Sequence, residues 1–220
     1  MAAYLANVGV NAGHAATSPL FDDGTFALTP IPEAQPWRPP MLRFADIPAH
    51  TVPVSWSGRA AHLDPDLLGE IATYGDNCRT AGRAFSLRRA QPGDLIAFVA
   101  RLESAERVAR FSIVGCLDVA DVLPDVERDP GAGWWDSNAH VRRARAHDTW
   151  NSFWVFRGGP SSRVLKQAVP FGRAEAAAVF GDSWLWRANR TELQTIGSYT
   201  RAVRRLEGEG EAWLRKTCLS

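Results

Sequence analysis

The chain has 220 residues, of which 45% are hydrophobic and 22% are charged, and its formal net charge is +1. These values are typical of a globular domain and exclude collagen, coiled coils and a histone-like polycation. No apolar run approaches the ~18 residues of a membrane span, and the N-terminus lacks the pattern of a signal peptide. We therefore expect a cytoplasmic protein without membrane contacts, whose three cysteines are reduced.

The first part of the chain predicts short strands joined by long loops. Residues 4–10 are apolar enough for a strand, and residues 11–24 form a loop rich in small residues that ends in an Asp-Gly turn. Residues 35–53 carry five prolines without a clear period. We expect this segment to be extended chain on the surface.

Two short helices are predicted after this segment. Asp64 is a suitable N-cap for a helix that opens after His62, and Pro65 fits its first position. Asp66 would complement the positive end of the helix dipole. Residues 79–90 predict the second helix, with small and apolar residues facing inward.

The middle of the chain predicts an antiparallel hairpin. Residues 95–100 form a continuous apolar run, a polar connection follows, and residues 111–119 predict the returning strand. Residues 152–156 and 164–169 predict a second strand pair. Residues 173–180 predict a short helix rich in alanine.

The C-terminal segment predicts a helix from Thr191, because apolar residues recur at spacings of three and four. These apolar positions are Ile196, Tyr199, Val203 and Leu206. No regular crossover helices separate the strands, which argues against a doubly wound sheet. We predict one α+β domain over residues 1–220, with flanking helices and either a bent, mainly antiparallel sheet or a small PUA-like barrel. The rival fold is an open sheet covered by helices on one face.

His62, Asp64 and Asp66 form the densest polar cluster of the sequence. A histidine beside two carboxylates can serve as a general base or bind a divalent cation. Helix capping and compensation of the helix dipole explain both aspartates without any chemistry. Both interpretations stay open, and His14 and His140 are the candidates to complete a catalytic site. The common nucleotide-hydrolase, dehydrogenase and zinc-protease motifs do not occur, so the sequence assigns no cofactor.

Nine tryptophans are an unusual number, since each buried ring carries an N–H that requires a partner. The most basic stretch of the chain, residues 140–148, lies between tryptophans. A groove of this kind suits stacked bases and phosphate groups. The residues that would form it are Trp134, Trp135, Arg142, Arg143, Arg145 and Trp150. The alternative is a solvated surface loop over packed tryptophans.

Several segments, taken in order, resemble the third of the nucleotide modification associated domain families. They are Ser18-Pro19, Asp23-Gly24, Pro30-Ile31-Pro32, His62 to Leu67, Tyr74-Gly75 and Gly93-Asp94. His140 with Asn151 downstream is similar to part of the family's His-Pro-His element, whereas residues 8–11 replace its Arg-Lys-Gly-Phe-Asp element. The resemblance implies a place in the modified-base systems of bacteria and phages, and it implies that Ser18, Asp23 and Asn151 are among the ligand-binding residues.

The hairpin that contains Gly93-Asp94 and Gly115 also resembles PUA-like domains of the EVE and YTH types, which hold a base in an aromatic pocket. Two functions are therefore expected. The first is a domain that binds nucleic acid or a nucleotide, linked to modified bases, through the groove of tryptophans and arginines. The alternative is an enzyme that processes a nucleotide or modified base at His62, Asp64 and Asp66, with or without a metal ion. The sequence carries no signal for an oligomeric state.

Overall fold

The computed structural model describes residues 1–47, 52–181 and 184–219. The strands are β1 (Ala3–Asn7), β2 (Ser18–Pro19), β3 (Ile31–Pro32), β4 (Leu42–Arg43), β5 (Ala60–His62), β6 (Thr73–Asp76), β7 (Leu95–Glu103), β8 (Ala109–Val126), β9 (Phe153–Gly158), β10 (Arg163–Pro170) and β11 (Arg204–Leu206). The α-helices are α1 (Ala139–His147), α2 (Arg173–Phe180), α3 (Glu192–Thr200) and α4 (Glu209–Leu219). The 3₁₀ helices are η1 (Phe44–Asp46), η2 (Val54–Trp56) and η3 (Gly82–Arg89).

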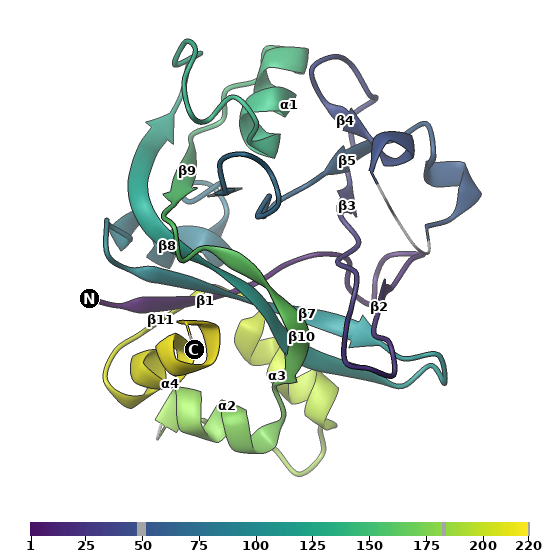
Figure 1. Ribbon diagram of the computed structural model, residues 1–220, viewed down its shortest axis with the longest axis vertical. Helices are drawn as coiled ribbons and strands as arrows, with labels where there is room; N and C mark the ends of the chain where they lie inside the picture. The colour runs from purple at the N-terminus through teal and green to yellow at the C-terminus, as the bar shows by residue number, and fades with distance from the viewer. Residues whose placement is uncertain (48–51, 182–183, 220) are drawn as a thin grey trace.

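A bent sheet forms the centre of the molecule. Its strand order is β11-β1-β7-β8-β9-β6, while β10 also pairs with β8 and β2 with β7. β8 has 18 residues and changes partners along its length, from β7 and β10 to β9. Interruptions of the register between β8 and β9 accompany the bend. A smaller sheet, β3-β5-β4, lies beside α1 (Figure 1).

The prediction of an α+β fold with a bent, mainly antiparallel sheet is confirmed. Among the described strands, β1 and β2 run parallel to their partner β7, and the other strand pairs are antiparallel. The described strands form no closed barrel. The bent sheet is therefore the alternative that the structure shows.

The central sheet separates two packed layers. On one face Val99 and Ile113 pack with α2, α3 and α4, which cover that face (Figure 1). On the opposite face Tyr4 and Phe98 pack with Phe156 of β9. β7 is thus buried on both faces, which explains its continuous apolar run. α1 and the small sheet lie on the side away from the three C-terminal helices.

The prediction of a helix after His62 is wrong. Residues 60–62 are strand β5, which pairs with β3 and β4, and the backbone of Asp66 exchanges two hydrogen bonds with Thr73. Since these backbone groups have partners on other segments, tertiary pairing overrides the local capping signal of Asp64. The capping interpretation of the two aspartates therefore has no helix on which to act.

Other elements agree with the sequence in part. The β7-β8 hairpin and α2 are confirmed, and a helix does begin after Thr191, whose side chain caps α3. However, α3 ends at Thr200, because residues 204–206 pair with the edge of β1 as β11; α4 was not predicted. Residues 164–169 do form a strand, but β10 pairs with β8 and not with β9. Residues 79–90 contain the 3₁₀ helix η3.

None of the helices in the described parts of the chain is long and apolar enough to cross a membrane. Cys78, Cys116 and Cys218 are all buried and free. Their state agrees with the expectation that the cysteines are reduced.

Candidate active site

Two histidines and a carboxylate from distant parts of the chain meet at one place. His62 ends β5, Asp64 follows two residues later, and His140 lies in the first turn of α1. Asp64 Oδ2 is 3.7 Å from His62 Nε2 and 3.4 Å from His140 Nε2. His140 is therefore the candidate that joins His62 and Asp64, whereas His14 accepts a hydrogen bond within its own loop.

The carboxylate of Asp64 is held at the edge of the central sheet. Both of its oxygens accept the backbone N–H of Gly75 in β6, at 3.0 and 2.9 Å. The Asp64 side chain is only 2% exposed. Burial raises the pKa of Asp64 well above its usual range; the Gly75 hydrogen bond opposes this shift, and the charges of Asp76 and Asp66 add to it. Asp64 consequently keeps its proton to a higher pH than an exposed aspartate does.

The position of the proton on His140 follows from its neighbour Arg143. Arg143 Nη2 is 3.1 Å from His140 Nδ1, and a guanidinium only donates hydrogen bonds. The Nδ1 atom must therefore accept, so that Nε2 carries the N–H and faces Asp64. Burial lowers the pKa of His140 well below its ordinary value, and the charges of His62 and Arg143 act in the same direction. His140 is thus neutral, and its Nε2 lies 3.4 Å from Asp64 Oδ2.

Glu33, directly after β3, orients the second histidine. His62 Nδ1 is 2.7 Å from Glu33 Oε1, and Arg143 Nη1 is 3.7 Å from Glu33 Oε2. Burial by itself raises the pKa of Glu33, but the hydrogen bonds and charges of His62 and Arg143 outweigh it and the pKa is lowered. Glu33 is therefore an ionised acceptor and His62 Nδ1 its donor. In a neutral His62 the lone pair is then on Nε2, the ring nitrogen 3.7 Å from Asp64 Oδ2.

These contacts form a closed ring of residues, because Arg143 contacts both His140 and Glu33. We call the five residues Glu33, His62, Asp64, His140 and Arg143 the His–Asp network. The raised pKa of Asp64 favours its protonated form. A carboxyl group of raised pKa with an imidazole nitrogen 3.7 Å away is an arrangement that acid–base sites use.

The same three side chains also carry atoms that can act as metal ligands. One ligand atom from each of His62, Asp64 and His140 lies within 4.8 Å of the others, a spacing that a divalent metal could use. A metal needs the lone pair of His140 Nε2, however, and Arg143 keeps the proton on that nitrogen. Asp66 adds no ligand to this group, since its Oδ1 accepts the backbone N–H of Gly69 at 3.0 Å. The network therefore fits proton transfer better than metal binding.

Gly75 and Asn138 set the position of His140. Asn138 caps α1, with its Oδ1 accepting the His140 backbone N–H at 3.0 Å and its Nδ2 donating to Thr73 Oγ1 at 3.2 Å. A Cβ at Gly75 would lie 2.8 Å from His140 Cδ2. The close approach of the imidazole to the β6 backbone therefore requires glycine.

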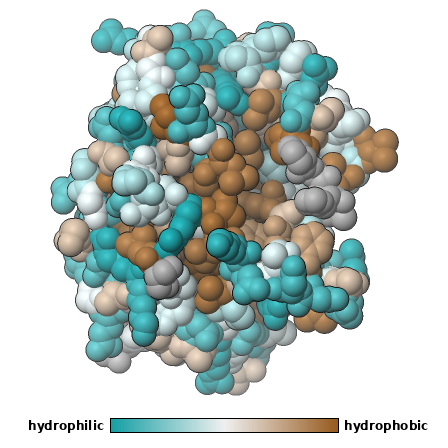
Figure 2. Space-filling view, in the orientation of Figure 1, coloured by the Kyte–Doolittle hydropathy of each residue, from teal (hydrophilic) through white to brown (hydrophobic). Residues whose placement is uncertain are grey.

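A pocket of about 560 Å³ borders the network, a volume typical of small-molecule sites. Asp64 and Asp66 line it together with mainly apolar side chains, which include Phe26, Leu28, Leu63, Leu67, Phe98 and Val114. Figure 2 shows hydrophobic side chains gathered in a hollow in the middle of the face in view. The apolar walls suit a flat ring such as a base, and Asp64 is the member of the network that lines this pocket.

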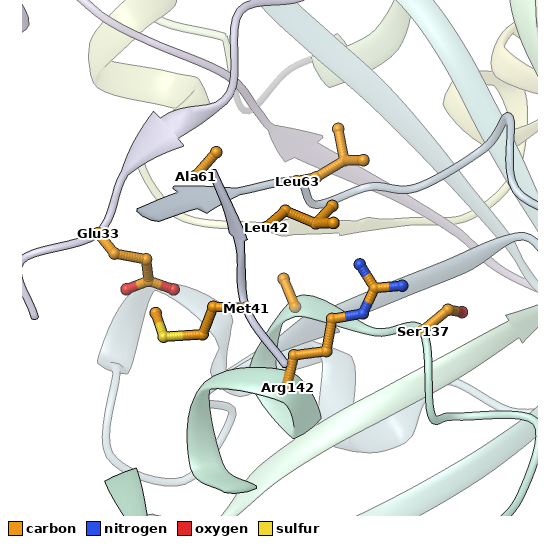
Figure 3. Close-up of a pocket in the computed structure, with 8 residues that line it drawn as sticks. Glu33, Met41, Leu42, Ala61, Leu63, Ser137 and Arg142 are labelled. Carbon is orange, nitrogen blue, oxygen red and sulfur yellow. The ribbon is translucent and has the colours of Figure 1, made fainter. Parts of the chain in front are cut away.

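A second cavity lies on the Glu33 side of the network. Figure 3 shows Glu33, Leu42 of β4, Ala61 of β5 and Arg142 of α1 around it. Its volume of about 10 Å³ is that of a single water molecule. This cavity is therefore too small for a base, unlike the pocket of about 560 Å³. The Arg142 side chain extends from α1 toward the small sheet (Figure 3).

The predicted groove of tryptophans and arginines is largely used for packing. The stretch that begins at His140 is helix α1 and not a loop. Trp134, Trp135 and Trp150 pack against a buried cluster under α1. Arg145 pairs with Asp129 at 3.1 Å and with Asp136 at 3.0 Å, and Arg143 belongs to the His–Asp network. The ligand-binding role of these residues stays a prediction.

The residues implied by the resemblance alone make local contacts. The Ser18 Oγ accepts the backbone N–H of Thr29 at 3.1 Å, and Asp23 Oδ1 accepts both the backbone N–H and the hydroxyl of Thr25. Asn151 Oδ1 is buried without a hydrogen-bond partner among the described residues. Their part in ligand binding also stays a prediction.

Sequence reasoning missed Glu33 and the position of Arg143 in the network. The available signal for Glu33 was its place directly after Pro30-Ile31-Pro32. For Arg143 the signal was its spacing of three residues from His140, which places both side chains on one face of a helix. That spacing was informative only once the segment was known to be helical.

The family model described as nucleotide modification associated domain 3 matches residues 3–214. The matched range contains all five residues of the His–Asp network. No curated protein and no solved structure matches the chain. Because the match covers nearly the whole sequence, the chain belongs to the nucleotide modification associated domain 3 family.

Proposed function

We propose that this domain is an enzyme that processes a nucleotide or a modified base by proton transfer at the His–Asp network. Membership of the family supports an association with nucleotide modification. The observation that carries the proposal is the meeting of His62, Asp64 and His140 at the wall of an apolar pocket large enough for a base.

Each residue of the network has a role that follows from its contacts. Asp64 borders the pocket and exchanges a proton with the substrate. His62 Nε2 accepts or returns that proton, and Glu33 stabilises the imidazolium that forms. His140 remains neutral with its Nε2 3.4 Å from Asp64 Oδ2, so it contacts the carboxyl group without taking its proton.

The other candidate function, binding without catalysis, rests on Trp134, Trp135, Trp150 and the arginines of α1. Arg143 and Arg145 already have carboxylate partners, and a phosphate would have to displace them. The structure therefore supports the enzymatic proposal better, and binding without turnover is an outcome of the test below.

The test is turnover of a panel of nucleotides, nucleosides and modified bases, with products detected by mass spectrometry. We expect wild-type protein to convert at least one member of the panel. His62→Ala and Asp64→Asn should stay folded and lose about 100-fold or more of the rate, as expected when a proton-transfer group is removed. His147→Ala, in the last turn of α1 and outside the network, is the matched control and should keep the rate. A His62→Ala protein with full activity contradicts the proposal.

A further inference from the structure

A second large pocket opens beyond the end of β1. Its volume is about 620 Å³, and it lies between the β1 loop, β6, β7 and one face of α3. The face of α3 is formed by Leu193, Gln194, Gly197, Thr200 and Arg201. β1 and β7 are parallel neighbours, and the carboxyl ends of parallel strands are where ligands bind in open sheets.

The charges around this pocket favour an anion. Three arginines, Arg83, Arg101 and Arg201, line it against a single carboxylate, Asp76. Asp76 pairs with Arg83, whose Nη2 is 3.8 Å from Asp76 Oδ1, and it also accepts hydrogen bonds from the Tyr74 hydroxyl and the next backbone N–H, so Arg101 and Arg201 remain without a carboxylate from this lining. Arg201 is exposed and forms no ion pair with any residue that the structure describes. The pocket therefore presents an excess of guanidinium groups, which bind phosphate oxygens through paired N–H donors.

Neutral polar side chains also line this pocket. Asn7 Nδ2 donates to Thr200 Oγ1 at 3.1 Å, which ties the end of β1 to α3.

Arg101 is 3.6 Å from Glu103, but Glu103 also pairs with Arg107 at 3.0 Å. Because Glu103 is shared between two arginines, it does not neutralise Arg101 fully.

The two large pockets adjoin. Gly9 lines both of them, and Tyr74 of the second pocket packs edge-on against Phe98 of the first, with ring centroids 5.1 Å apart. Gly9 has a φ of 72°, in the region that favours glycine, and a Cβ there would lie 2.7 Å from Leu28 Cδ1 in the wall of the first pocket. One pocket is apolar and the other cationic, which matches the two ends of a nucleotide.

We infer that the second pocket binds the phosphate group of a nucleotide whose base occupies the apolar pocket beside Asp64. This inference deepens the proposed function and rests on it for the position of the base. The phosphate site is argued independently, from the arginines that line the second pocket. It names the substrate class as a phosphorylated nucleotide instead of a free base or nucleoside. The phosphate can belong to a free nucleotide or to a nucleic-acid strand, since both present the same oxygens.

Isothermal titration calorimetry tests the inference with pyrophosphate, a nucleoside 5′-monophosphate, the matching nucleoside and a short single-stranded oligonucleotide. Wild-type protein should bind pyrophosphate and the monophosphate, and the monophosphate should bind more tightly than the nucleoside. The double variant Arg101→Gln/Arg201→Gln should bind both phosphate ligands roughly tenfold or more weakly, as expected for lost charge-assisted hydrogen bonds. Nucleoside binding should not change. Tighter binding of the oligonucleotide than of the monophosphate identifies a strand as the source.

Arg128→Gln is the matched control, because Arg128 is an exposed arginine that does not line this pocket. Arg201 is exposed at the end of α3, so Arg201→Gln alone replaces the double variant if that variant unfolds. The single variant should still weaken pyrophosphate binding severalfold. Unchanged pyrophosphate affinity in the arginine variants overturns the inference, as does wild-type protein that binds neither phosphate ligand. Phosphate binding that depends on these arginines, found without turnover of any substrate, contradicts the proposed function but not the phosphate site.

Discussion

Substitution of Gly75 by alanine tests the position of His140 without any knowledge of the substrate. The added Cβ would lie 2.8 Å from His140 Cδ2, 3.0 Å from Asn138 Oδ1 and 3.2 Å from the Trp154 carbonyl oxygen. Ordinary contacts between carbon atoms begin near 3.5 Å, so the imidazole must withdraw by about 0.7 Å or more. The His140 side chain is only 6% exposed and Trp154 belongs to β9, which leaves little room for the shift.

Overpacking of this kind costs about 1–3 kcal/mol of the free energy of unfolding. In a domain of this size each kcal/mol lowers the Tm by roughly 2–4 °C. Differential scanning calorimetry of Gly75→Ala should therefore show a Tm several degrees below that of the wild type. A displaced His140 should also reduce turnover, by up to about 100-fold for a shift near 1 Å.

Gly82→Ala is the matched control, since nothing lies within 4 Å of a Cβ at Gly82. Its Tm should equal or slightly exceed that of the wild type, because alanine restricts the unfolded chain. If Gly75→Ala had the Tm of Gly82→Ala, then His140 would not pack on β6, and the hydrogen bonds assigned to it would have no structural basis.

Two further predictions concern the pH dependence of stability, measured by urea unfolding between pH 4 and 8. Burial raises the pKa of Asp64 in the folded state, so the stability that its protonated form contributes is present below its ordinary value of 3.8 and is lost as the pH rises through the folded-state pKa. Asp64→Asn cannot ionise, and it should gain stability relative to the wild type as the pH rises; a difference that is independent of pH contradicts the raised pKa. The pKa of His140 is lowered, so its contribution is present above its ordinary value of 6.5 and is lost as the pH falls through the folded-state pKa. His140→Gln should therefore gain on the wild type as the pH falls below 6.5, and equal pH profiles of the two proteins count against a buried neutral histidine.

Strand periodicity and turn signals were sufficient to predict the central hairpin of β7 and β8. The apolar run of residues 95–100 and the returning strand form β7 and β8 because burial on both faces leaves a continuous apolar pattern. The start of a helix at Thr191 was also predicted from the sequence. Such a start is a local feature, since an N-cap depends on its own side chain and the next turn.

The segment from His62 to Asp66 could not be read in the same way. Its residues satisfy the local rules for a helix start, yet their backbone groups pair with strands that lie elsewhere in the sequence. Local pattern alone does not show such pairing. The meeting of His140 with Asp64 depends on it too, because β5 and β6 position Asp64 under α1.

Glu33 shows why a site is harder to predict than a fold. Nothing in the spacing of Glu33 and His62, which are 29 residues apart, indicates a hydrogen bond between them. The family elements were informative because they marked several of these segments together. The residues that complete the network were still visible only in three dimensions.

The proposed chemistry requires that the His–Asp network hold its protons on defined nitrogens. Long-range ¹H–¹⁵N NMR of the imidazoles at neutral pH measures these positions. We expect His62 to carry its proton on Nδ1, bound to Glu33, and His140 to carry its proton on Nε2, toward Asp64, and to remain neutral as the pH falls below 6.5. A His140 that carries its proton on Nδ1, or that titrates at its ordinary pKa, would contradict the network and return the site to the metal-binding interpretation.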